Sequence, residues 1–265
     1  MYPTISVLGL ELHTYGLMMV LGASLGITCS AGRAKQKGIS AEQEFLFLLH
    51  ALIGGIVGAK FLYLLPRIQE FWTYRSEIFQ TFDSFIAYIG GGFVFYGGLI
   101  GGLAAAALYC RYYKEPFMTM IEIAVPFIPL MHGIGRIGCF LTGCCYGIPS
   151  THYGIAFSIS QAAPNGIPLF PVQLAEACVN FILCVVLVLY TQKERAPLTA
   201  LGLYLSCYAV ARFLLEFLRY DSARGVYFFL STSQWISLIT LPIGIFLLTG
   251  NRRIIKGLQS SRWYH

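Results

Sequence analysis

The chain has 265 residues, of which 57% are hydrophobic and only 11% are charged. A water-soluble domain carries about a quarter charged residues, so this composition excludes a soluble enzyme, a disordered tail and a disulfide-stapled secreted domain. The net charge of +6 does not indicate a nucleic-acid binder, because the charges are sparse and separate apolar runs of about 20 residues, the length that crosses a bilayer. The sequence therefore predicts a polytopic membrane protein.

Seven apolar segments predict seven transmembrane helices, since lipid cannot satisfy free backbone N–H and C=O groups. In chain order they cover residues 13–32, 44–65, 88–110, 118–140, 172–191, 198–218 and 232–249. We expect one all-α transmembrane domain over residues 1–265, without internal repeats. No basic stretch precedes the first segment and no small-residue cleavage site follows it, so we expect this helix to be retained.

The basic residues between these segments predict the orientation of the chain. One side receives eleven of them, namely Arg33, Lys35, Lys37, Arg111, Lys114, Lys193, Arg195, Arg252, Arg253, Lys256 and Arg262. The other side receives four, namely Arg67, Arg75, Arg219 and Arg224. The positive-inside rule assigns the first set to the cytoplasm, so the N-terminus is expected outside and the C-terminus inside.

Two connecting segments on the predicted outer side are long. Residues 66–87 are aromatic and amphipathic, and they form either an arm lying in the membrane interface or an ordinary loop with aromatic anchors. Residues 141–171 are rich in Pro and Gly and hold no Lys or Arg. We expect this second segment to be mostly coil, or re-entrant backbone that lines a cavity.

Ionisable residues inside a bilayer are costly and normally face a cavity or one another. Following each helix direction, most of the polar residues within the spans reach the outer level: Tyr15, Lys60, Tyr96, Arg136, Gln173, Glu176, Arg212 and Glu216, with Arg219 just beyond. His50 and Glu122 lie near inner ends instead. Arg212, Glu216 and Arg219 share one helix face by their spacing, which indicates either an internal ion pair or part of a functional site.

Arg136 is the residue that favours a functional site. It lies between Gly135 and Gly138, with Gly133 three positions before it, so that a backbone or ligand can approach closely. The planar guanidinium bonds two phosphate oxygens at once. An anionic lipid head group in the outer leaflet is therefore the expected ligand.

A second glycine-dense stretch covers residues 93–102. Gly101, Gly102 and the alanines after them are typical of close helix packing. Tyr96 lies beside the expected polar cluster, where its hydroxyl could orient or deprotonate a reactive group.

Of the eight cysteines, five lie singly in spans and are expected to be small apolar residues. Cys139, Cys144 and Cys145 are clustered and leave four interpretations open. These are a zinc site completed by His132 or His152, a disulfide, a thiol activated by Arg136, and simple structural packing. The spacing favours structural packing, and we expect no metal site.

Six motifs along the chain resemble the prolipoprotein diacylglyceryl transferase family. They are Tyr15-Gly-Leu-Met, Tyr96-Gly-Gly-Leu-Ile-Gly, Gly135-Arg136-Ile-Gly-x-Phe-x-x-Gly143, Pro171-x-Gln173-Leu-x-Glu176, Arg212-Phe-x-x-Glu216-Phe-x-Arg219 and Ser231-x-x-Gln234-x-x-Ser237. The resemblance implies a multi-pass enzyme of the bacterial inner membrane. It would move the diacylglyceryl group of phosphatidylglycerol onto the lipobox cysteine of a prolipoprotein, recognised at its signal peptide, without a cofactor.

The resemblance also implies roles for individual residues. Arg136 and Arg212 would hold the phosphate of the lipid, Glu216 would orient Arg212, and Tyr96 is the expected third catalytic residue. The remaining residues expected around the substrate are Tyr15, Gly97, Gly98, Gly135, Gly138, Cys139, Gly143, Gly147, Gln173, Glu176 and Arg219.

The sequence departs from the family pattern at positions that would supply a base or form the rim of the pocket. Tyr96 stands where well-studied members have histidine, Cys139 replaces an asparagine, and Phe170 replaces a second histidine. Tyr96 or the substrate itself would then accept the thiol proton. A paralogue that uses the same lipid with another acceptor, a lipid-binding protein without chemistry, and a cysteine-based redox protein are the alternatives.

Overall fold

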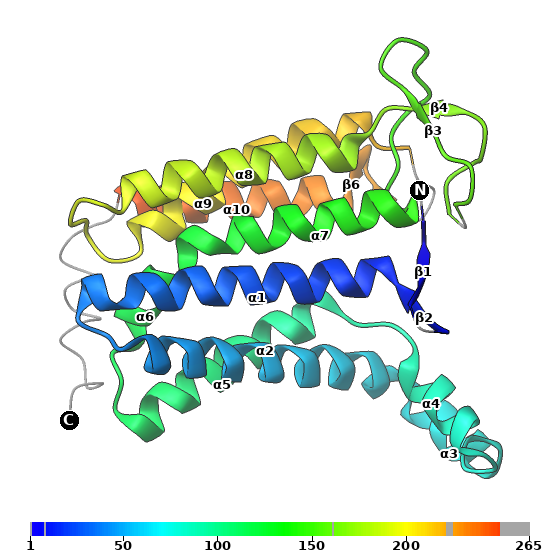
Figure 1. Ribbon diagram of the computed structural model, residues 1–265, viewed down its shortest axis with the longest axis horizontal. Coiled ribbons are helices and arrows are strands. Elements are labelled where there is room, and N and C mark those ends of the chain that lie inside the picture. The colour runs from blue at the N-terminus through cyan, green and yellow to red at the C-terminus, as the bar shows by residue number, and fades with distance from the viewer. Residues whose placement is uncertain (1, 8, 161, 221–224, 250–265) are drawn as a thin grey trace.

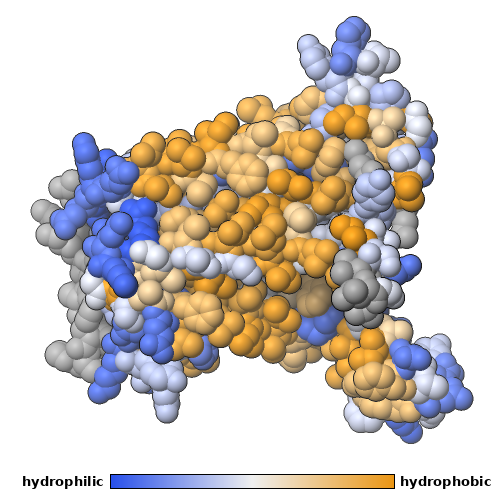
Figure 2. Space-filling view, viewed as in Figure 1, coloured by the Kyte–Doolittle hydropathy of each residue, from blue (hydrophilic) through white to orange (hydrophobic). Residues whose placement is uncertain are grey.

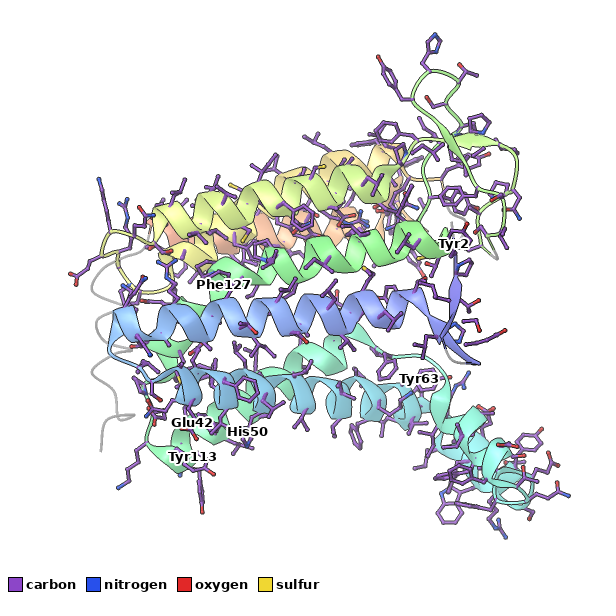
Figure 3. The ribbon with its side chains drawn as sticks, viewed as in Figure 1. Tyr2, Glu42, His50, Tyr63, Tyr113 and Phe127 are labelled. Carbon is purple, nitrogen blue, oxygen red and sulfur yellow. The ribbon has the colours of Figure 1, made fainter. Side chains whose placement is uncertain are left out.

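A computed structural model describes residues 2–7, 9–160, 162–220 and 225–249 of the chain. Its long helices run side by side, and the connecting segments gather at two opposite ends (Figure 1). One end carries the N-terminal hairpin, the helices α3 and α4, and the segment between α7 and α8. We call it the outer end, after the predicted orientation, and the opposite end the inner end. Figure 3 places Tyr2 and Tyr63 at the outer end and Glu42, His50 and Tyr113 at the inner end.

Eight helices make up the long body of the described chain. They are α1 (Thr14–Ala34), α2 (Ala41–Leu64), α5 (Phe95–Tyr113), α6 (Phe117–Ala124), α7 (Ile128–Thr142), α8 (Val172–Tyr190), α9 (Thr199–Leu215) and α10 (Thr232–Thr249). Short 3-10 turns extend or join them: η1 (Lys35–Lys37), η2 (Leu65–Arg67), η3 (Val125–Phe127) and η4 (Glu216–Leu218). Three antiparallel hairpins complete the fold: β1 (Thr4–Val7) with β2 (Leu10–His13), β3 (Ile155–Ala156) with β4 (Pro168–Leu169), and β5 (Val226–Tyr227) with β6 (Leu230–Ser231).

The polytopic membrane fold predicted from the sequence is confirmed. Within the described residues, six helices are long and apolar enough to cross a membrane, and a bent pair of helices brings the number up to seven if it counts as one span. An apolar belt covers the middle of the molecule, while hydrophilic residues gather at both ends (Figure 2).

The predicted span 88–110 differs from the observed helices. Its first residues belong to α4 (Phe82–Gly90), which makes an angle of 90° with α5, and residues 91–94 separate the two. The Lys60 ammonium donates to the carbonyls of Ile89 at 2.6 Å and Gly92 at 3.1 Å. These carbonyls at the end of α4 are satisfied by Lys60 rather than by a continuing helix, so the chain can turn here.

Basic residues sort to the two ends as the sequence predicts. The inner end holds Arg33, Lys35, Lys37, Arg111, Lys114, Lys193 and Arg195, whereas Arg67, Arg75 and Arg219 lie at the outer end. Five basic residues that also contribute to the predicted orientation lie outside the described residues, namely Arg224, Arg252, Arg253, Lys256 and Arg262.

Glycine contacts bring α2 and α5 close together. A Cβ atom added to Gly58 would lie 2.3 Å from the Gly97 carbonyl oxygen, and one added to Gly101 would lie 2.3 Å from the Gly54 carbonyl oxygen. Such approach allows extensive van der Waals contact between helices in lipid. The packing role expected for Gly101 is therefore confirmed.

The segment 66–87 forms most of a helical arm made of α3 (Ile68–Ile78) and α4, which projects from the outer end (Figure 1). Phe79 stacks on Phe85 with ring centroids 5.4 Å apart, while Trp72 and Phe82 are exposed. An exposed aromatic surface suits the membrane interface, and its position there stays a prediction.

The segment 141–171 is mostly coil, as expected, but it lies beyond the helix ends rather than re-entering the bundle (Figure 1). It has a small core of its own, in which Phe157, Ala163 and Leu169 are buried. Backbone hydrogen bonds join it to the end of α9, from Ile148 to the Leu218 carbonyl at 2.9 Å and from Tyr220 to the Tyr146 carbonyl at 3.0 Å.

Candidate active site

Arg136 lies in the outer half of α7, where glycines let neighbouring helices approach. A Cβ atom added to Gly133 would lie 2.6 Å from the Phe181 ring, and one added to Gly138 would lie 3.0 Å from the Met18 side chain. The glycines thus seat α7 between α8 and α1. The Arg136 side chain remains 16% exposed.

Glu176, on the second turn of α8, is the carboxylate around which the site is built. Its side chain is 2% exposed, and its oxygens lie 3.0 Å from an Arg136 guanidinium nitrogen and 3.6 Å from one of Arg212. The Tyr208 hydroxyl donates to the same carboxylate at 2.8 Å. A buried carboxylate is stable only when it is paired and hydrogen-bonded, and here two cations from different helices share it.

Glu216 extends the arrangement at the end of α9. Its Oε2 atom lies 2.7 Å from Arg212 Nη2 and 3.7 Å from Arg219 Nη1. The Arg212 Nη2 atom also donates to the Ser233 hydroxyl of α10 at 2.9 Å. The ion pair expected between Arg212 and Glu216 is therefore present, and it belongs to a larger set.

We call these five side chains the arginine–carboxylate network: Arg136, Glu176, Arg212, Glu216 and Arg219. Among the described residues it brings together three arginines and two carboxylates. Although Arg212 Nη1 lies within ion-pair distance of Glu176, it is buried and makes no hydrogen bond to any described residue. Because a buried N–H group without an acceptor is unfavourable, the network favours an additional anion.

Three neighbours of the network were not among the predicted site residues. His132 accepts from Arg136 Nε at 3.3 Å, and Tyr208 and Ser233 bond to the network as described above. His132 and Tyr208 each precede an arginine of the network by four residues, a spacing that places them on the same helix faces. Ser233 joins from α10, and its contact depends on tertiary packing.

The predicted residue Gly147 positions Arg219. The two residues form an isolated antiparallel bridge. A Cβ atom on Gly147 would lie 2.4 Å from the Phe170 carbonyl oxygen, so a larger residue would displace this backbone. Gly147 therefore affects the site by allowing the backbone to pass close to Phe170 and Arg219, and its own atoms add no functional group.

Other predicted residues lie around the outer end of α7. Gln173 is buried and donates to the Cys144 carbonyl at 2.8 Å. Tyr15, at the start of α1, packs over Gly138, while Gly135 faces Met19. Gly143 ends α7 in a left-handed conformation, with φ of 77°.

Cys139, Cys144 and Cys145 come together at this place. Their sulfur atoms lie within 4.8 Å of one another. Hydrogen bonds from the Cys139 and Cys144 thiols, assisted by Arg219 and Arg136, lower the pKa of Cys145 below the ordinary thiol value.

The predicted residues of α5 have different surroundings. Tyr96 is 48% exposed and its ring contacts that of Phe95, while Gly97 and Gly98 face α2. None of the described residues forms a hydrogen bond with the Tyr96 hydroxyl. The structure thus gives these glycines a packing role, and the part of all three in catalysis or binding stays a prediction.

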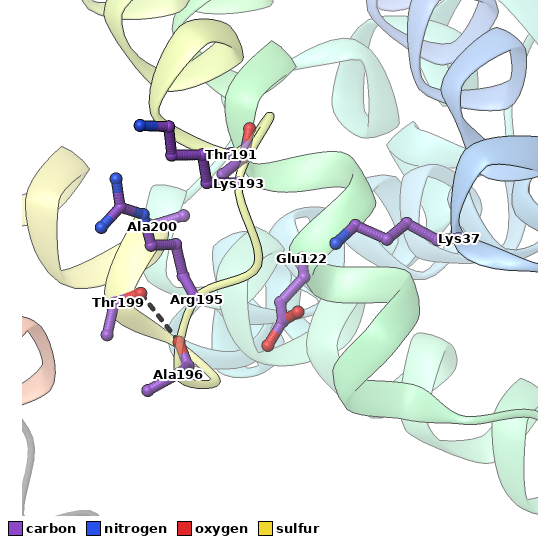
Figure 4. Close-up of a pocket in the computed structure, with 8 residues that line it drawn as sticks. All are labelled: Lys37, Glu122, Thr191, Lys193, Arg195, Ala196, Thr199 and Ala200. Carbon is purple, nitrogen blue, oxygen red and sulfur yellow. Dashed lines mark hydrogen bonds between the residues drawn. The ribbon is translucent and has the colours of Figure 1, made fainter.

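The inner end holds a pocket lined by Lys37, Glu122, Lys193, Arg195 and Thr199, among others, in which Lys37 points toward Glu122 (Figure 4). His50 lies near this end, where its Nδ1 atom is 2.7 Å from the Leu46 carbonyl oxygen. At the inner end, therefore, a single carboxylate, Glu122, lies among basic residues of the connecting loops. The arginine–carboxylate network, by contrast, lies at the outer end.

Comparison with known proteins shows the family of this chain. The family model described as prolipoprotein diacylglyceryl transferase matches residues 3–249. The chain belongs to this family. The resemblance of the six sequence motifs is thereby confirmed.

Curated relatives resemble the chain along almost its whole length. A phosphatidylglycerol–prolipoprotein diacylglyceryl transferase of Clostridium tetani is 38% identical over 245 residues, which cover 92% of this chain and 95% of the relative. A protein of Clostridium perfringens with the same name and the number 2 is 36% identical over 256 residues, which cover 96% of each. A Clostridium botulinum relative of the same name is 30% identical over 245 residues, covering 90% and 92%. The assignment of the chain as a transferase is supported by these relatives.

Proposed function

We propose that this chain transfers the diacylglyceryl group of phosphatidylglycerol to the lipobox cysteine of prolipoproteins at the outer face of the bacterial inner membrane. The observation that carries the proposal is the arginine–carboxylate network. In it, Arg136 and Arg212 share the buried carboxylate Glu176, and Arg212 Nη1 makes no hydrogen bond to any described residue. The names and lengths of the matched relatives support the same substrates and reaction.

Arg136 and Arg212 are the expected phosphate ligands. They come from α7 and α9 and are held by the same carboxylate, Glu176, so their guanidinium groups are fixed relative to one another. Planar guanidinium groups bind phosphate through paired hydrogen bonds. Glu176, Glu216 and Ser233 act as positioning residues because they fix these two groups before the lipid arrives.

In the transfer step, the lipobox thiolate attacks the glyceryl carbon that carries the phosphate ester. A sulfur–carbon bond forms, the carbon–oxygen bond breaks, and glycerol phosphate leaves with the bonding electron pair. Negative charge increases on the leaving phosphate, so arginines already oriented toward it stabilise the transition state. The substrates supply every reacting atom, and no cofactor is required.

The thiol proton has two candidate acceptors, the Tyr96 side chain and the phosphate of the lipid. A positioned general base typically contributes about 10²-fold to 10⁴-fold to a rate. Replacement of Tyr96 by Phe distinguishes the two. A loss of that size assigns the proton to Tyr96, and a small effect assigns it to the lipid phosphate.

The decisive experiment incubates the purified full chain with labelled phosphatidylglycerol and a lipobox peptide. We expect lipidated peptide with the native chain and none above background with Arg136→Ala or Arg212→Ala. Arg111→Ala, which removes an exposed arginine at the inner end, is the matched control and retains transfer.

The same experiment tests the alternatives. Transfer to material in native membranes but not to the lipobox peptide would indicate another acceptor for the same lipid. Lipid binding without transfer to either acceptor would contradict the proposed reaction and favour a non-catalytic lipid-binding protein. Function that is unaffected by replacement of Cys139, Cys144 and Cys145 with Ser would remove the redox alternative.

A further inference from the structure

The three clustered thiols are brought together by an unusual turn of the backbone. Cys139 lies in the last turn of α7, and the Cys144 amide donates back to its carbonyl at 3.1 Å. Gly143 has φ of 77° and Cys145 has φ of 57°, so the chain reverses direction within three residues. Left-handed backbone at a residue other than glycine is uncommon, and here it directs a second and a third thiol toward Cys139.

The turn is also fixed from α8. Gln173 is 1% exposed and donates to the Cys144 carbonyl at 2.8 Å, and the Thr142 hydroxyl lies 3.5 Å from the Cys144 sulfur atom. Cys139 is buried, whereas Cys144 and Cys145 are partly exposed. One side of the cluster is therefore held by protein, and the other is open to an entering ion.

We propose that Cys139, Cys144 and Cys145 form a binding site for one thiophilic divalent cation of the zinc and cadmium class. Zinc is bound by thiolates at about 2.3 Å, so three sulfur ligands around one ion lie roughly 4 Å apart. The present separations of up to 4.8 Å need only a small contraction. Soft sulfur ligands select zinc-like or monovalent copper ions over magnesium and calcium, and the partly exposed side leaves the fourth position to water.

The surrounding charges suit such a complex. Three thiolates and one divalent cation carry a net charge of −1, and the electrostatic influence of Arg136 and Arg219 reaches the Cys145 sulfur. These two cations stabilise the complex, because its net charge is opposite to theirs.

The other cysteines provide an internal reference. Among the residues that the structure describes, the other five cysteines do not lie in any group of three possible metal ligands. They are Cys29, Cys110, Cys178, Cys184 and Cys207. The structural packing that we expected for these five cysteines therefore suffices for them. For Cys139, Cys144 and Cys145 the structure points to a chemical role.

The test is a cadmium titration of the purified full chain in detergent, kept under a phosphine reductant so that no disulfide forms. We expect a thiolate-to-metal charge-transfer band in the ultraviolet that saturates at one Cd²⁺ per chain. Three of the eight thiols should become protected from a thiol reagent in the same titration. Each measurement is independent of transfer activity and therefore of the proposed function.

Variants locate the site. Cys145→Ser, which changes a partly exposed side chain, should weaken cadmium binding at least about tenfold, and the combined replacement of all three cysteines by serine should abolish the band. Cys178→Ser, at an exposed cysteine of α8, is the control and keeps both the band and its stoichiometry. A native chain without the band, or a band unchanged by Cys145→Ser and by the triple replacement, would overturn the proposal.

Discussion

The buried charges at the two ends of the bundle are stabilised in different ways. At the inner end, Arg33 donates to the Thr191 carbonyl at 2.8 Å, and Glu44 accepts from the Ser30 hydroxyl at 2.7 Å. Each of these hydrogen bonds joins an ionisable side chain to a neutral partner. At the outer end, three arginines share two carboxylates within one network. Buried charge is thus held by single neutral partners at the inner end and by shared ion pairs between helices at the outer end.

The comparison is tested most strongly by removing arginines from the two ends. We expect Arg136→Ala and Arg212→Ala to lower the rate of transfer by at least about 10²-fold to 10³-fold, the usual cost of losing one donor to a developing charge. Arg33→Met at the inner end should lower thermal stability but leave the specific activity of the folded fraction within about threefold. If Arg33→Met lowered activity as much as Arg136→Ala and Arg212→Ala do, the two ends of the bundle would not differ in function.

A second prediction concerns the carboxylates. Glu176→Gln leaves Arg136 and Arg212 without a shared counter-charge, and breaking one partner of a buried ion pair costs about 3–5 kcal/mol. Glu44→Gln retains an oxygen that can accept from Ser30, so we expect less than about 1.5 kcal/mol there. Thermal unfolding in detergent, followed by circular dichroism, measures both, and a larger loss for Glu44→Gln would contradict the comparison.

Substitution at the uncharged contact between α2 and α5 is expected to lower stability less than Glu176→Gln does. A Cβ atom on Gly58 would meet the Gly97 carbonyl at 2.3 Å, and overpacking of this kind costs about 1–3 kcal/mol. Gly32→Ala is the control, since a Cβ atom there has no heavy atom within 4 Å. Similar unfolding temperatures for Gly58→Ala and Gly32→Ala would show that the helices do not approach so closely.

An effect confined to the arm is expected at Lys60, which binds the end of α4. Lys60→Met removes the donors to the carbonyls of Ile89 and Gly92, each worth about 1.5–3 kcal/mol as a charged hydrogen bond, less on a partly exposed surface. Amides around residues 89–92 should exchange with deuterium faster, while those of α7 remain unchanged. Unaltered exchange near the end of α4 would show that Lys60 does not hold the arm.

Sequence patterns predicted the parts of the molecule that depend on position along a helix. Hydropathy and length located the spans, and the direction of each helix predicted that Arg136, Glu176, Arg212 and Glu216 would meet at one level. These inferences succeed because the depth of a residue in a membrane helix follows from its distance to the helix end.

Features that depend on contacts between distant backbones were not predictable in the same way. The break between α4 and α5 depends on Lys60 from another helix, and the position of Arg219 depends on its bridge to Gly147. The cysteine cluster depends on left-handed backbone at Cys145, and a cysteine in the sequence does not predict that conformation. His132 and Tyr208, in contrast, could have been found from their four-residue spacing to the arginines.

The central claim is that the arginine–carboxylate network holds the phosphate of the lipid, and equilibrium binding tests it most directly. The affinity of the purified chain for phosphatidylglycerol is compared with its affinity for diacylglycerol, which has the same tails without the phosphate. We predict that Arg136→Ala and Arg212→Ala weaken phosphatidylglycerol binding at least about tenfold and leave diacylglycerol binding unchanged. Unchanged phosphatidylglycerol binding in both folded variants would contradict the claim.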